Sequence, residues 1–82
     1  MRYRIEISEK AREQLRVMPK EIRRTIGYRI ELMRSDLHGD VVKLRDKGNR
    51  YRLRVGTFRV LFVLAGDVIK VYAVKDRKEA YD

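Results

Sequence analysis

The sequence predicts an α+β domain in which a helical hairpin packs on one face of a mostly antiparallel sheet, in the order β-α-α-β-β-β-β. Three observations predict this fold. Polar and apolar residues alternate in the first seven residues and again after residue 41, as in half-buried strands. Between these segments, apolar residues recur at helical spacing on both sides of Pro19. Finally, Gly56-Thr57 and Gly66-Asp67 each fit a two-residue hairpin loop.

The length of the chain indicates a single small domain, and its net charge indicates an anionic partner. The chain has 82 residues, so we expect a single domain spanning 1–82 with a modest core. It carries 21 lysines and arginines against 12 acidic residues, a net charge of +9, which makes nucleic acid the first partner to consider, before an anionic membrane or an acidic protein. Cysteine is absent, which excludes disulfides and thiolate metal sites. Without an 18-residue apolar run or a signal-peptide pattern, we expect a cytoplasmic protein that does not span a membrane.

The N-terminal half is predicted to form one strand and two helices. Residues Arg2–Ile7 alternate and predict the strand, and Ser8 is a suitable N-cap for the helix that follows. Pro19 ends that helix after Met18, because proline has no backbone N–H to donate, and it also suits the first turn of the next helix. Residues 35–40 are expected to form a loop. The apolar stripes of the two helices comprise Ala11, Leu15 and Met18, and Ile22, Ile26, Ile30 and Met33.

The C-terminal half is predicted to contain four strands joined by tight turns. Residues 42–45 form a short strand, and residues 58–64 are the most apolar run and the expected central strand. A two-residue loop at Gly56-Thr57 places Arg54 opposite Arg59 and Arg52 opposite Leu61.

A two-residue loop at Gly66-Asp67 sets the register of the last strand. It pairs Leu64 with Ile69, Phe62 with Val71, Val60 with Ala73 and Arg59 with Val74. Ala73 is then expected on the helix-covered face and Val74 on the opposite face, and residues 75–82 form a tail.

The arginines of the first hairpin suggest a surface that binds phosphate. Arg50, Arg52 and Arg54 alternate with apolar residues, so all three share one face of their strand. Arg54 beside Arg59 places like charges together, at a cost of roughly 0.2–1 kcal/mol. This repulsion has no purpose in a purely structural sheet. It is explained if the guanidinium groups bind a polyanion, because the bound anion offsets the repulsion.

The strands Tyr51–Val55 and Phe58–Phe62, together with the closing run Arg77–Tyr81, carry a family resemblance. In order and spacing, across essentially the whole chain, the sequence resembles the RelE branch of the RelE/ParE toxin superfamily. The resemblance implies a ribosome-dependent messenger RNA endonuclease that cuts the codon in the ribosomal A site without a metal or other cofactor. The 2′-hydroxyl attacks the adjacent phosphate. It also implies three partners: the ribosome, messenger RNA and a small acidic RelB-like antitoxin.

The resemblance also assigns residues to roles. It implies that Arg59 and Arg77 stabilise charge on the phosphate, and that Tyr81 orients or deprotonates the 2′-hydroxyl. Arginine stays protonated in proteins, so Arg52 and Arg54 are poor general bases and better suited to hold the RNA backbone. The candidate catalytic residues are Arg52, Arg54, Arg59, Arg77 and Tyr81. The candidate RNA-binding residues are Lys43, Arg45, Arg50, Arg52 and Arg54.

Several alternatives stay open. The chain could be a non-catalytic ParE-like toxin that poisons gyrase, or a general RNA-binding module. The arginine face could be ordinary solvated surface, Arg77 could pair locally with an acidic neighbour, and Tyr81 could serve packing. Tyr72 could stack on a base or simply cover the sheet. His38 has no histidine or cysteine partner in the sequence that would suggest a metal site.

Overall fold

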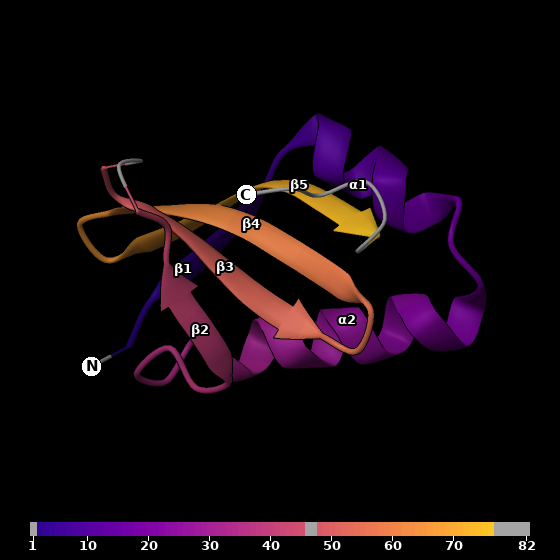
Figure 1. The fold of residues 1–82 in the computed structure, drawn as a ribbon, viewed down its shortest axis with the longest axis horizontal. Coiled ribbons are helices and arrows are strands. Elements are labelled where there is room, and N and C mark those ends of the chain that lie inside the picture. The colour runs from indigo at the N-terminus through magenta and orange to yellow at the C-terminus, as the bar shows by residue number, and fades with distance from the viewer. Residues whose placement is uncertain (1, 46–47, 77–82) are drawn as a thin grey trace.

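The computed structural model describes residues 2–45 and 48–76, and these form two helices and five strands (Figure 1). In chain order the elements are β1 (Arg4–Ile7), α1 (Glu9–Arg16), α2 (Lys20–Leu32), β2 (Asp40–Lys43), β3 (Arg50–Val55), β4 (Phe58–Ala65) and β5 (Val68–Asp76). The predicted order of elements is confirmed. Neither helix is long and apolar enough to cross a membrane within the described ranges.

The five strands form one sheet in the order β1-β5-β4-β3-β2, with β4 in the centre as expected. Neighbouring strands are antiparallel except for β1, which runs parallel to β5 and closes one edge (Figure 1). The mostly antiparallel α+β fold predicted from the sequence is therefore confirmed.

Two strand boundaries differ from the prediction. β1 begins at Arg4 rather than Arg2, and Arg2 instead forms an isolated antiparallel bridge with Ser35. β2 covers residues 40–43 rather than 42–45. Both strands lie at the edges of the sheet, where one side lacks a neighbouring strand to fix the limits of pairing.

The helices form where the sequence provides their caps. The Ser8 side chain accepts a hydrogen bond from the Ala11 N–H at 3.1 Å and caps α1. α1 ends at Arg16, two residues before the predicted end at Met18, which still packs against the core. Pro19 then occupies the N-cap of α2.

Both helices cover the same face of the sheet, and the core lies between the helices and that face. Ala11 and Ile26 are fully buried there. The opposite side of the sheet is called the open face below. The buried cluster comprises Ala11, Ile26, Ile30, Met33, Leu53, Val55, Val60, Phe62, Ile69, Val71 and Val74.

The β3–β4 hairpin has the predicted register. Arg54 pairs with Arg59 and Arg52 pairs with Leu61. Gly56 has a φ of 59°, whereas Thr57 is not among the described residues with positive φ. This combination fits the predicted type II′ turn, in which the first central residue alone has positive φ.

The β4–β5 pairing contains a bulge that the sequence analysis did not predict. Leu61 pairs with Ala73 and Phe62 pairs with Val71, so Tyr72 is an extra residue on β5. Beyond the bulge, the predicted pairs of Val60 with Ala73 and Arg59 with Val74 are wrong by one residue. Val74 joins the core and Ala73 pairs on the open face.

α1 satisfies the backbone of β5 around the bulge, where β1 has ended. The Ser8 hydroxyl donates to the Tyr72 carbonyl at 3.4 Å, and the Ser8 N–H donates to the Val71 carbonyl at 2.9 Å. Further along β5, the Val74 N–H donates to the Gln14 side-chain oxygen at 2.7 Å. These bonds replace the missing strand neighbour and stabilise the shifted register.

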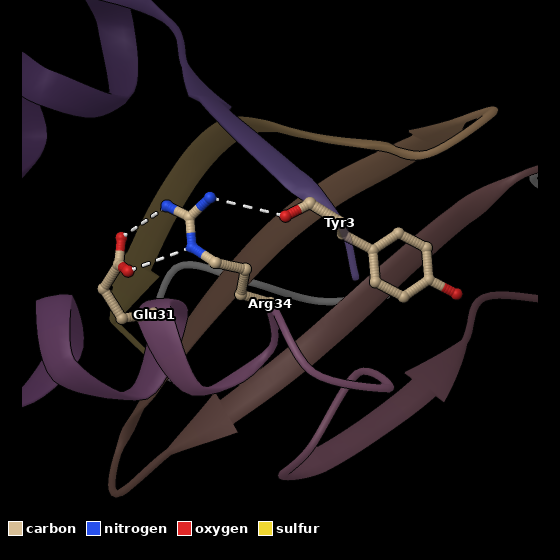
Figure 2. A network of polar contacts seen from close by, with 3 residues as sticks. All are labelled: Tyr3, Glu31 and Arg34. Carbon is tan, nitrogen blue, oxygen red and sulfur yellow. Dashed lines mark hydrogen bonds and ion pairs between the residues drawn. The ribbon is translucent and has the colours of Figure 1, made fainter. Parts of the chain in front are cut away.

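The end of α2 is joined to the chain that leads into β1. Figure 2 shows Arg34 donating to the Tyr3 carbonyl at 3.4 Å while both its Nε and Nη2 donate to Glu31. The Tyr3 N–H donates back to the Arg34 carbonyl at 2.8 Å. The hydrogen bond to Glu31 raises the pKa of Arg34 above its ordinary value.

Candidate RNA-binding site

Three cations lie side by side across the open face. Arg54 of β3 pairs with Arg59 of β4, and the bulge places Lys75 of β5 opposite Arg59. We call Arg54, Arg59 and Lys75 the cationic row. Side chains in directly opposed positions have Cβ atoms about 4.5–5.5 Å apart. The row therefore places three positively charged side chains on three consecutive strands, each one strand spacing from the next.

A pocket opens at one end of this row, beside the hairpin turn. It has a volume of about 140 Å³, and Arg54 and Arg59 line it together with the turn residues Gly56 and Thr57 and with Phe58. One water molecule occupies about 30 Å³ in the liquid, so the pocket can admit a phosphate group. Two guanidinium groups in one small pocket provide the planar, charged donors that bind phosphate oxygens strongly.

One carboxylate lies at the β2 end of the row. Asp40 pairs with Arg54 across the strands, and its Oδ2 atom is 3.9 Å from the Arg54 Nε. Both side chains are about half exposed, at 51% for Arg54 and 52% for Asp40. Exposed pairs of this kind contribute about 0–1 kcal/mol, so Asp40 holds Arg54 only weakly.

Arg52 is held differently from Arg54. Arg52 is half-buried and its Nη1 atom is enclosed, while its cross-strand neighbour on β4, Leu61, is also buried. The guanidinium therefore lies against the sheet rather than extending into solvent. This position gives Arg52 less freedom to reach a ligand than Arg54 has.

At the far end of β3, Arg50 lies over an aromatic ring. Its guanidinium carbon is 5.6 Å from the centre of the Tyr72 ring, within the range of a cation–π contact. Tyr72 therefore presents an aromatic ring on the same face as the arginines, as its position in the sequence pattern predicts. A base that stacked on Tyr72 would share this ring with Arg50.

The sequence and the fold of this chain are similar to those of known proteins. No family model matches the chain. However, the curated protein "Toxin RelE3" of Methanocaldococcus jannaschii is 36% identical, over 83% of this chain and 83% of its own length. The chain belongs to the RelE toxin family.

Solved structures support the family assignment. The RelE–RelB complex of Pyrococcus horikoshii OT3 matches with a TM-score of 0.80 at 28% identity, over 98% of this chain and 100% of that chain. The RelB–RelE antitoxin–toxin complex of Methanococcus jannaschii matches with a TM-score of 0.75 at 29% identity, over 88% and 89%. Escherichia coli toxin RelE, at 17% identity and over 98% of this chain and 88% of its own, has a TM-score of 0.80 and confirms the fold alone.

Not every predicted site residue of this RelE-family chain joins the cationic row. Lys43 pairs with Tyr51, which packs toward the core, so its position lies on the other side of the sheet from Arg54. Arg45 follows β2 and is exposed. The two C-terminal candidates, Arg77 and Tyr81, lie outside the described residues.

Lys75 was not predicted to lie on the open face, because the sequence pattern placed it in the tail. β5 continues to Asp76, and the bulge turns Lys75 onto the open face. The available signal was the run Val71-Tyr72-Ala73-Val74, which is apolar throughout and therefore compatible with two registers.

Proposed function

We propose that this chain is the toxin of a type II toxin–antitoxin pair and that it cleaves messenger RNA in the ribosomal A site. The observation that carries the proposal is the cationic row beside a phosphate-sized pocket. Membership of the RelE family supports the toxin role. The complexes with RelB formed by its structural relatives support an acidic RelB-like antitoxin as a partner.

In the proposed reaction, the RNA itself supplies the nucleophile. The 2′ oxygen loses its proton and attacks the adjacent phosphorus. The bond from phosphorus to the 5′ oxygen then breaks, and that oxygen gains a proton. The products are a 2′,3′-cyclic phosphate and a 5′-hydroxyl. Negative charge develops on the phosphate oxygens during the attack, where Arg54 and Arg59 would donate hydrogen bonds.

Proton transfer requires a different side chain from these arginines. A guanidinium group remains protonated in proteins, whereas a lysine ammonium group can give up a proton. Lys75, beside Arg59, is therefore our choice for the donor to the 5′ oxygen. Tyr81 and Arg77 stay proposed members of the site for the 2′-hydroxyl and the phosphate.

Substitution of Arg59 tests the proposal. Loss of one preorganised donor to a transition-state oxyanion typically costs about 2.7–4 kcal/mol, or 10²–10³ in rate. We expect Arg59→Ala to slow A-site cleavage on programmed ribosomes by that factor, measured by toeprinting. Lys10→Ala is the matched control, because it removes one positive charge from an exposed position on α1 and should leave the rate nearly unchanged.

Two results would contradict the proposal. One is wild-type cleavage by Arg59→Ala at equal concentration. The other is growth arrest by the wild-type chain with intact A-site codons and accumulating DNA breaks, which would favour a gyrase poison. Strong binding to free RNA without toxicity would instead indicate a general RNA-binding module.

A further inference from the structure

Arg50 and Tyr72 form a second cluster on the open face, apart from the cationic row. Arg50 pairs with Val63 of β4, and Tyr72 lies on β5, the next strand of the sheet (Figure 1). The Arg50 side chain therefore reaches across β4 to place its guanidinium carbon 5.6 Å from the centre of the Tyr72 ring. We call Arg50, Val63 and Tyr72 the platform.

The backbone around the bulge holds the Tyr72 ring in place. The Tyr72 carbonyl accepts a hydrogen bond from the Ser8 hydroxyl at 3.4 Å. The preceding carbonyl, of Val71, accepts from the Ser8 N–H at 2.9 Å. Because the start of α1 anchors the bulge, little further ordering of the ring is needed when a ligand binds to it.

The platform and the cationic row are joined by one strand. Arg50 and Arg54 both belong to β3, and their side chains share the open face. At a rise of about 3.3 Å per residue, their Cα atoms are about 13 Å apart. An extended single strand of RNA that places one phosphate at Arg54 can therefore continue along β3 and bring a neighbouring nucleotide to the platform.

The side chains of the platform are accessible and chemically suited to a nucleotide. Arg50 is exposed, and Val63 and Tyr72 are half-buried. An exposed cation–π contact is weaker than the stacking of a nucleobase on an aromatic ring. A base can therefore take the ring face that Arg50 covers, and the released guanidinium can bind the phosphate of the same nucleotide.

We propose that the platform binds one nucleotide that flanks the scissile phosphate, with its base stacked on Tyr72 and its phosphate bound by Arg50. Stacking strengthens with the size of the base, so the platform favours a purine over a pyrimidine. The inference rests on the proposed function for RNA as the ligand. It adds a specificity-determining subsite outside the phosphate-sized pocket.

The charges around the platform indicate the path of the RNA strand. Lys70 pairs with Val63 from the β5 side and is exposed, but Glu6 of the edge strand β1 pairs with Lys70 in turn. The Glu6 carboxylate repels phosphate from that edge. The backbone of the RNA therefore lies on the β3 side, at Arg50, and its base points across β4 toward Tyr72.

Binding of short oligoribonucleotides to the full-length chain tests the platform. Fluorescence anisotropy compares oligoadenylate, oligouridylate and an abasic oligoribonucleotide of the same length, which keeps the sugars and phosphates but carries no bases. We expect the wild-type chain to bind oligoadenylate most tightly. Tyr72→Leu should weaken oligoadenylate binding about fivefold or more, the lower end for loss of one stacked base, and should change abasic binding less than twofold.

Matched variants separate stacking from other effects. Tyr72→Phe keeps the ring and should bind all three probes within twofold of wild type. Tyr28→Leu makes the same change at a residue of α2 that is 64% exposed, on the helix side of the sheet, and should leave binding unchanged. Arg50→Ala should lower the log–log salt slope of abasic binding by about 0.7, the value for one lost phosphate contact. If Tyr72→Leu does not fold, Tyr72→Met replaces it with the same expectation, since the flexible methionine side chain adapts to irregular surroundings.

Four results would overturn the inference. They are unchanged oligoadenylate binding in Tyr72→Leu, equal losses of oligoadenylate and abasic binding in that variant, a loss in Tyr28→Leu as large as in Tyr72→Leu, and a salt slope that Arg50→Ala leaves unchanged. None of these measurements requires RNA cleavage. Tyr72-dependent binding by a chain that leaves A-site codons intact would refute the nuclease proposal alone. Cleavage of A-site codons by a chain whose oligoadenylate binding is independent of Tyr72 would refute the platform alone.

Discussion

The hydrogen bond from Val74 to Gln14 gives the sharpest test of how α1 holds the end of β5. Val74 is 2% exposed, and its N–H donates to the Gln14 side-chain oxygen at 2.7 Å. Gln14→Leu keeps the approximate size of the side chain but removes the acceptor. A buried donor left without a partner costs about 1–3 kcal/mol. For a domain of this size, each kcal/mol corresponds to about 4–8 °C in Tm, so a loss of about 2 kcal/mol lowers Tm by about 8–16 °C.

Thermal unfolding followed by circular dichroism measures the change in Tm. Hydrogen exchange shows whether protection is lost at the Val74 amide itself. Gln14→Glu is the matched control, because a carboxylate oxygen can still accept from Val74. We expect Gln14→Leu to unfold at a clearly lower temperature than Gln14→Glu and to exchange the Val74 amide faster. Equal Tm values for the two variants, or unchanged exchange in Gln14→Leu, would refute the proposed role of this bond.

Further predictions concern binding and backbone geometry. Arg54→Ala should reduce the log–log salt slope of oligoribonucleotide binding by about 0.7, the value for one lost phosphate contact, whereas Lys10→Ala, at an exposed position on α1, should leave the slope unchanged. Gly39→Ala should destabilise the fold by about 1–3 kcal/mol in urea unfolding, because Gly39 has a φ of 129° and an added Cβ would lie 2.9 Å from the Leu53 Cδ1. Gly27→Ala should instead stabilise the fold by about 0.5–1 kcal/mol, since Gly27 lies inside α2 and an added Cβ meets nothing within 4 Å. Stabilisation by Gly39→Ala, or a salt slope that Arg54→Ala leaves intact, would contradict these assignments.

The first hairpin could be predicted from the sequence because two independent signals agree. Gly56 supplies the positive φ that the turn requires, and strict alternation of arginine with apolar residues leaves one register that buries the apolar set. A slip of one residue would have buried Arg52 and Arg54 in the core. The sequence alone therefore predicts the positions of Arg54 and Arg59, and the observed register agrees with them.

The second hairpin could not be predicted to its end, for the opposite reason. Residues 71–74 are all apolar, so a shift by one residue costs little in burial. The deciding contacts come from Ser8 and Gln14, which are about sixty residues away in the sequence. Such non-local hydrogen bonds leave no periodic signal. For this reason Lys75 was missed as a neighbour of Arg59.

The parallel pairing of β1 with β5 has a consequence for the order of folding. Arg4 pairs with Val68, so this edge of the sheet forms only when residues 64 positions apart in the sequence meet. Closing so long a loop costs chain entropy before the contact returns any stability, whereas the β3–β4 and β4–β5 hairpins join neighbouring segments. We therefore expect the two hairpins to form first and the β1–β5 edge to complete the sheet.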